Sequence, residues 1–235
     1  MRDERDPNAE RGPGETFPYP ETLPAHVVED GPAPRIHGYA VFDDLARHAS
    51  FGEVALLTLL GEEPTPEAAR AFEVALVCLA PLSLADAAVH AATLARMTAG
   101  RHQAVLATGG IALAERAAWL LDQHASLFEW LDGGRGPAPE AVTARPEARA
   151  SLTRVRAAVE ASGLPVPALT HDLSIDAALL TVLRACGLRA RWQVEAALVL
   201  AWTPALAAEA ACMRPYAFKD YPFNAPPFVY EGSKP

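Results

Sequence analysis

The fold is decided by Ile36-His37-Gly38-Tyr39-Ala40-Val41-Phe42-Asp43-Asp44-Leu45, followed by Ser50-Phe51-Gly52-Glu53-Val54 and by Leu60-Gly61-Glu62-Glu63-Pro64-Thr65. Ser50 and Glu53 have the spacing of a capping box, in which each side chain accepts a hydrogen bond from a backbone N–H of the other's turn. Gly61 is suited to end that helix because glycine adopts the left-handed conformation at little cost. Thr65 followed by Pro66 predicts the start of a second helix, since the first helical N–H has no partner to lose.

From residue 43 onward, apolar residues recur three and four positions apart and strand-like alternation is absent, which predicts an all-α protein. Before that region, a short hairpin is expected where His26-Val27-Val28 turns at Asp30-Gly31 toward Arg35-Ile36. The pair Gly109-Gly110 falls inside a helix and indicates close helix packing, because no strand precedes it and no phosphate-binding motif completes it. Beyond the two opening helices, the expected helices cover residues 83–99, 104–121, 146–162, 175–185 and 192–213.

Composition limits the function classes. The chain has 235 residues, 51% of them hydrophobic, so it can bury a sizeable core as one large domain or two coupled small ones. The net charge of -9 opposes nucleic-acid binding. No uninterrupted apolar run approaches the roughly 20 residues that span a bilayer, so we expect a soluble, cytoplasmic protein with no membrane partner.

The cysteines and histidines do not suggest a metal site. Cys78, Cys186 and Cys212 are far apart without CxxC spacing, which favours reduced core thiols over disulfides or zinc ligands. No two histidines have the i, i+4 spacing of a helical metal site, so no metal is expected.

Both ends of the chain differ in composition from the body. Residues 1–34 hold eight acidic residues, three arginines and seven prolines, and we expect 1–26 to be a disordered arm. Residues 214–235 form a second arm, rich in aromatic residues and proline. A segment this apolar is expected to lie on a surface, either that of a dimer partner or that of its own subunit.

The opening stretch resembles that of the citrate synthase family, which has an acidic pair and a leucine, then a helix entered at Ser-Phe-x-Glu and left at Gly-Glu-x-Pro-Thr. The similarity covers about residues 27–232 and is closest in form to short citrate synthase-like and citryl-CoA lyase proteins. The later matches are Ala95–Ala99, Leu106–Leu113, Leu173–Leu180, Leu198–Ala208, Arg214-Pro215 and Tyr230–Gly232.

The resemblance implies an all-α dimer with a large and a small domain and an active site in the cleft between them. The large domain is then expected at 27–106 and 177–213, and the small domain at 107–176. The family's reaction needs a carboxylate base, two histidine donors and arginines that hold carboxylates. No cofactor is implied; a coenzyme A thioester is a possible substrate.

Several family positions are changed. Asp176 matches the base, whereas the histidine of the His-Gly-Gly-Ala motif falls at about Ala117 and no histidine lies between residues 125 and 170. The late-helix arginine matches Trp202, and its histidine matches Glu209. The motif positions therefore lack the usual catalytic histidines.

Three other residues are candidates through the resemblance. His171 precedes Asp176 by five residues and is either a replacement donor or a solvated or capping residue. His37 occupies the place of a family arginine and is a candidate for binding an anionic group. Arg214 belongs to the closing Arg-Pro motif and is a candidate substrate-binding residue.

These observations favour a citrate synthase-like protein that is non-catalytic, as a heteromeric partner subunit or a protein that binds acyl-CoA or carboxylates. The alternative is an active enzyme that makes or breaks a carbon–carbon bond in an acyl-CoA, of the citrate or methylcitrate synthase or citryl-CoA lyase type, with Asp176 as base. A helical scaffold whose C-terminal arm carries the function is a third hypothesis. The expected partners are a second copy or a family paralogue, with acyl-CoA and di- or tricarboxylates as ligands.

Overall fold

The computed structural model describes residues 24–98, 100–133 and 136–214. The chain divides into two compact units, Met1–His48 and Ala49–Pro235, which we describe separately. The predicted N-terminal arm lies outside the described residues up to residue 23, and the C-terminal arm lies outside them from residue 215.

The first unit contains a three-stranded antiparallel sheet of β1 (Val28–Glu29), β2 (Arg35–Ile36) and β3 (Tyr39–Ala40). The pairing of β1 with β2 confirms the predicted hairpin. Strand β3 was not predicted; it pairs with β2 across the two-residue turn His37-Gly38. Both turn residues have positive φ, 47° and 87°, as a tight turn between antiparallel strands requires. A π-helical turn, Val41–Leu45, and the short helix α1 (Ala46–His48) follow.

The second unit opens with the two helices predicted from their end signals. Helix α2 (Phe51–Leu60) has the capping box of Ser50 and Glu53, and Gly61 ends it in the left-handed conformation. The Ser50 hydroxyl also donates to Glu73 of α3 (Pro66–Leu79), which ties the two helices together. The Thr65 side chain accepts from the backbone N–H of Ala68 at 3.2 Å, so both helices begin as predicted.

The remaining helices confirm the all-α class for the described residues, although the third helix differs in its start and one helix was not predicted. The third helix begins later than expected because Asp86, rather than Ser83, accepts from its first turn. A separate helix, 125–133, was not recognised in the sequence because its apolar run is short. The elements are α4 (Ala87–Met97), α5 (His102–Gln123), α6 (Ala125–Gly133), α7 (Arg149–Ser162), α8 (Ile175–Ala185) and α9 (Arg191–Cys212), with 3-10 turns Glu140–Val142, Pro146–Ala148 and Pro167–Thr170.

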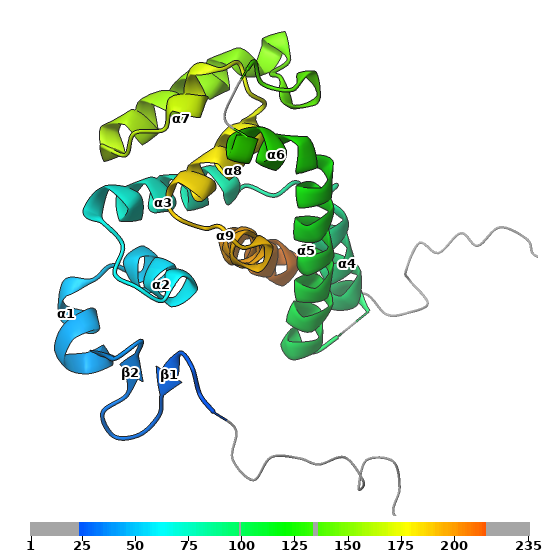
Figure 1. The fold of residues 1–235 in the computed structure, drawn as a ribbon. Helices are drawn as coiled ribbons and strands as arrows, with labels where there is room; N and C mark the ends of the chain where they lie inside the picture. Colours follow the sequence, from blue (N-terminus) through cyan, green and yellow to red (C-terminus); the bar gives the residue numbers. More distant parts are fainter. Residues whose placement is uncertain (1–23, 99, 134–135, 215–235) are drawn as a thin grey trace, which may run out of the picture. The chain divides into compact units, whose positions relative to one another are not determined.

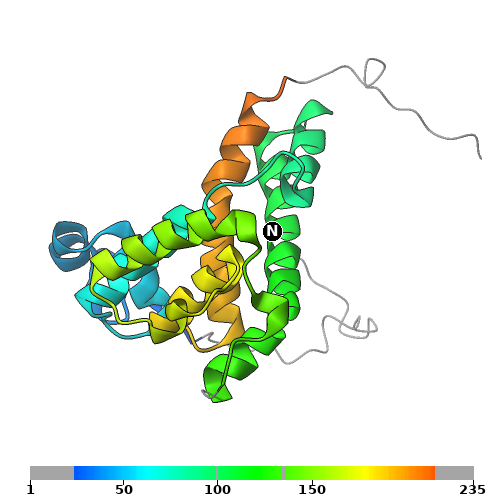
Figure 2. The same ribbon diagram turned by 90° about the horizontal axis from the view of Figure 1, so that it is seen from above.

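Helix α9 lies beside α4 and α5, as both views of the ribbon show (Figures 1 and 2). It runs antiparallel to α5, since Arg191 at its start bonds Asp122 near the end of α5 while Leu206 packs against Gly109. A Cβ on Gly109 would lie 2.6 Å from Leu206 Cδ2, so close helix packing is confirmed at this glycine. It is wrong for Gly110, where a Cβ would meet nothing within 4 Å. Helix α8 contacts α3, α7 and α9, and its apolar residues belong to the same core.

Helices α5 and α9 are each long and apolar enough to cross a membrane when judged by length and composition alone. The core helices of soluble proteins pass the same test. These two helices pack against each other and against α4.

Candidate functional site

Asp176 lies in the first turn of α8, where Ser174 caps the helix by accepting from the backbone N–H of Ala177 at 3.2 Å. The Asp176 side chain is exposed. Within residues 24–98, 100–133 and 136–214, its carboxylate makes no hydrogen bond or ion pair. It is therefore accessible, with the partly positive N-terminus of a helix beside it.

His171 ends the 3-10 turn Pro167–Thr170 and is half-buried. Its backbone carbonyl accepts from Arg156 Nη2 at 2.6 Å. Its ring packs edge-on against Trp130 of α6, with centroids 4.9 Å apart and an interplanar angle of 87°. The imidazole is thus in an aromatic contact, and no hydrogen bond joins it to Asp176 in the described part of the chain.

The other two candidates, His37 and Arg214, lie toward the two ends of the described residues. His37 is a turn residue of the first unit, and its backbone N–H donates to the carbonyl of Val27 at 2.9 Å. Arg214 is exposed and follows the C-cap of α9, Met213. Their roles as substrate-binding residues, like those of Asp176 and His171 in catalysis, stay predictions.

The two positions that the resemblance matches to a family histidine and arginine, Ala117 and Trp202, belong to the same hydrophobic core. Ala117 of α5 is fully buried, and Trp202 of α9 is 2% exposed. The guanidinium carbon of Arg116 lies 4.3 Å from the centroid of the Trp202 ring. Arg116 also forms an ion pair with Asp86, the N-cap of α4. This cluster of Arg116, Trp202 and Asp86 therefore joins α4, α5 and α9.

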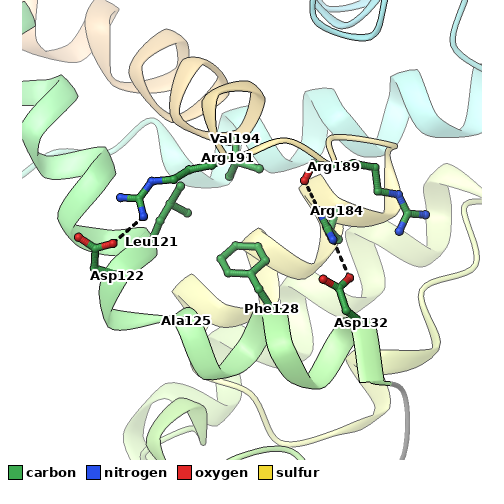
Figure 3. Close-up of a pocket in the computed structure, with 9 residues that line it drawn as sticks. All are labelled: Leu121, Asp122, Ala125, Phe128, Asp132, Arg184, Arg189, Arg191 and Val194. Atoms are coloured by element: carbon green, nitrogen blue, oxygen red, sulfur yellow. Dashed lines mark hydrogen bonds and ion pairs between the residues drawn. The ribbon is translucent and has the colours of Figure 1, made fainter.

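A cavity of about 300 Å³ lies between α6 and the connection from α8 to α9 (Figure 3). Phe128 lies between two ion pairs: Arg191 Nη1 with Asp122 Oδ1, and Arg184 Nη2 with Asp132 Oδ1, both at 2.6 Å. The full lining is Leu121, Asp122, Ala125, Phe128, Asp132, Arg184, Arg189, Arg191 and Val194.

The charges that line this cavity are largely neutralised. Hydrogen bonds to Asp122 and Glu195 raise the pKa of Arg191, so its guanidinium stays charged and engaged. Arg184 bonds both Asp132 and the backbone carbonyl of Arg189. The ion pairs link the start of α9 to α5 and the end of α8 to α6.

Similar proteins were found by comparison of structures and not by comparison of sequences. No family model matches the amino-acid sequence, and no curated protein matches it significantly. Citryl-CoA lyase from Hydrogenobacter thermophilus superposes with a TM-score of 0.64 and 17% identity, over 88% of this chain and 96% of that chain. The chain has the citrate synthase-like fold.

Two structures of ATP citrate lyase share the citrate synthase-like fold over about half their length. The enzyme from Methanothrix soehngenii, solved with citrate and coenzyme A, gives a TM-score of 0.55 at 16% identity, over 100% of this chain and 48% of that one. A mutant from Methanosaeta concilii with (3S)-citryl-CoA gives 0.57 at 16% identity, over 97% and 47%.

The citrate synthase-like fold was predicted from the sequence, but two features of the second unit were not. The cluster of Arg116 with Trp202 and Asp86 joins residues far apart in sequence, and no local pattern reports it. The cavity beside Phe128 had a weak signal, since Arg184, Arg189 and Arg191 lie within eight positions around Gly187. None of the four predicted site residues lines that cavity.

Proposed function

We propose that this protein is a citrate synthase-like protein without the usual condensation chemistry, acting as a ligand-binding or partner subunit. One observation carries the proposal: the residues at the histidine and arginine positions, Ala117 and Trp202, are both buried in the helical core. Neither residue has a group that can donate a proton or grip a carboxylate.

In the family's reaction, absence of the donor residues would lower the rate strongly. Each positioned general acid or base contributes about 10² to 10⁴ in rate, so the absence of two donors removes roughly 10⁴ to 10⁸. Two of the described imidazoles are engaged in other contacts. His171 is packed on Trp130, and Nδ1 of the buried His124 lies 2.9 Å from the carbonyl oxygen of Leu120 in its own helix.

The ligand class follows from the structures that share the fold. One ATP citrate lyase binds citrate and coenzyme A, and another binds (3S)-citryl-CoA. We therefore propose that a coenzyme A thioester and a di- or tricarboxylate are the ligands of this chain. The proposed location is the cytoplasm, in an assembly with a second copy or with a family paralogue that supplies the missing groups.

The test combines a turnover assay with a binding measurement. Purified full-length protein is incubated with oxaloacetate and acetyl- or propionyl-CoA, and separately with citryl-CoA, and products are measured. We expect no turnover above background but measurable coenzyme A binding by calorimetry. Turnover near the median enzyme rate of about 10 per second contradicts the non-catalytic role, and absence of any coenzyme A binding supports the scaffold hypothesis instead.

A second candidate function is favoured by one observation, the exposed and unpaired Asp176 carboxylate within the described residues. An active carbon–carbon bond-forming or bond-cleaving enzyme would use it as the base. Asp176→Asn then abolishes turnover, while the matched variant Asp172→Asn, which breaks the Arg149 ion pair nearby, leaves turnover in place. Activity that survives Asp176→Asn removes this residue from the reaction.

A further inference from the structure

The cavity between α6 and the connection from α8 to α9 is separate from the candidate catalytic residues. None of the four predicted site residues lines it. Arg184, which does line it, lies eight residues beyond Asp176 on α8, or about 12 Å along the helix axis. The cavity has a volume of about 300 Å³, at the lower end of the range for small-molecule sites. It therefore has room for a small ligand of its own.

Two arginines of this cavity have N–H groups that no protein acceptor uses. Arg184 bonds Asp132 through Nη2 and the backbone carbonyl of Arg189 through Nη1, but its Nε is buried without an acceptor among the described residues. The Arg189 side chain is exposed and makes no hydrogen bond or ion pair within residues 24–98, 100–133 and 136–214. A buried donor without an acceptor is unfavourable, and an unpaired guanidinium binds anions well. Both arginines therefore favour an anionic ligand.

The charges of the lining leave one cation without a counter-charge. Two of the three lining arginines are paired with the two lining aspartates, Asp122 and Asp132. Arg189 is the third arginine, and in the described chain it is unpaired. Glu195 also pairs with Arg191 but does not line the cavity. One negative charge on a ligand is balanced by Arg189, whereas further negative charges would face the two aspartates.

The rest of the lining is apolar and includes an aromatic ring. Phe128 points from α6 into the space between the two ion pairs (Figure 3). Leu121 and Val194 are buried, and Ala125 completes the apolar part of the lining. A flat apolar group stacks favourably on a phenylalanine ring in an offset arrangement. The lining therefore suits a ligand that combines one anionic group with a flat apolar body.

We propose that this cavity binds a small monocarboxylate with a flat apolar body, such as an aromatic carboxylic acid. The carboxylate accepts from the guanidinium of Arg189, whose fork of N–H groups matches two carboxylate oxygens, and from Nε of Arg184. The two arginines are held near each other because Nη1 of Arg184 bonds the Arg189 carbonyl. The apolar body lies against Phe128. This inference goes beyond the proposed function, whose tricarboxylate ligand carries too many charges for this site.

The ligand class is tested with benzoate as the probe. Isothermal titration calorimetry of the full-length protein measures its affinity, and we expect a dissociation constant of about 1 mM or tighter. Benzamide has the same shape without the charge, and isophthalate has the same ring with a second carboxylate. Each should bind at least roughly tenfold more weakly than benzoate, because one loses the contact with Arg189 and the other places a charge near the aspartates.

The location is tested with three variants. Arg189→Gln should weaken benzoate binding roughly tenfold or more, because charge-assisted hydrogen bonds are lost. Phe128→Leu keeps the lining apolar but removes the ring, and it should weaken binding about two- to tenfold. Arg101→Gln is the matched control, because Arg101 is also exposed and unpaired in the part of the chain that the structure describes, but caps the other end of α5. Circular dichroism checks that each variant keeps its helices.

Four results overturn the inference: no benzoate binding, benzamide or isophthalate binding as tight as that of benzoate, an affinity that Arg189→Gln leaves unchanged, or an equal loss in Arg101→Gln. The measurements that test the proposed function use coenzyme A and its thioesters, which are different ligands. Failure of benzoate binding is therefore distinguishable from failure of the proposed function.

Discussion

The guanidinium carbon of Arg116 lies 4.3 Å from the centroid of the Trp202 ring, in a cation–π contact between α5 and α9. The same guanidinium pairs with Asp86, whose side chain is only 12% exposed. The Trp202 ring therefore serves as a packing surface for Arg116.

Trp202→Arg is expected to destabilise the protein by about 3 to 5 kcal/mol. The change removes a buried aromatic side chain and places a second guanidinium beside Arg116 without a partner. Urea unfolding followed by circular dichroism measures the change in free energy of unfolding. Trp192→Arg is the matched control on the same helix, where the side chain is 57% exposed and the cost should stay within about 0.5 kcal/mol. Equal stability of the two variants would remove the packing role of Trp202.

Substitution of alanine for each of the two adjacent glycines of α5 should change the stability of the protein in opposite directions. A Cβ on Gly109 meets Leu206 Cδ2 at 2.6 Å and the Cβ of Ala92 at 3.1 Å, whereas a Cβ on Gly110 meets nothing within 4 Å. Gly110→Ala should stabilise by up to about 1 kcal/mol through helix propensity. Gly109→Ala should lose this gain to overpacking, which costs about 1 to 3 kcal/mol. Thermal unfolding of both variants decides the question, and a stabilised Gly109→Ala would show that the α5–α9 contact is loose.

Ser50→Ala should cost about 1 kcal/mol of stability. The substitution removes the cap on α2, in which Ser50 Oγ accepts from the Glu53 N–H at 3.2 Å, and the link to Glu73 of α3. The midpoint of urea unfolding measures the loss. Ser151→Ala, at an exposed position in the first turn of α7, serves as control and should change stability by less than about 0.5 kcal/mol. A loss no greater than that of the control argues against a stabilising cap.

The three cysteines should react with a thiol reagent at very different rates. Burial raises the pKa of the Cys186 thiol to about 12 and also raises that of Cys78, whereas Cys212 is exposed. Since the thiolate is the reactive form, Cys212 should be labelled first and Cys186 only after unfolding. Mass spectrometry of labelled peptides reports the order. Rapid labelling of Cys186 in the folded protein would contradict its burial.

The same burial predicts an alkaline loss of stability. The folded protein keeps Cys186 neutral up to about pH 12, while in the unfolded chain the thiol ionises near its ordinary pKa of 9.0. The stabilisation is therefore complete below about pH 9 and is lost as the pH rises from 9 toward 12. Cys186→Ser should shift this alkaline dependence, and Cys212→Ser should not.

The elements that sequence reasoning missed had little local signal. Strand β3 is two residues long and depends on a turn in which His37 takes a positive φ, a conformation uncommon outside glycine. The helix 125–133 continues from α5 after only His124, so its start carries no cap that sets it apart.

The sequence by itself determined where α2 and α8 begin and end and where α3 begins, and it indicated the citrate synthase-like fold. Helix ends depend on groups within about four residues of each other, as at Ser50 with Glu53, so local spacing is sufficient. Only the tertiary structure decided that Arg116 lies on Trp202 and that Gly109 packs against Leu206. Those features join or separate residues far apart in the chain, and their geometry exists only once the helices pack.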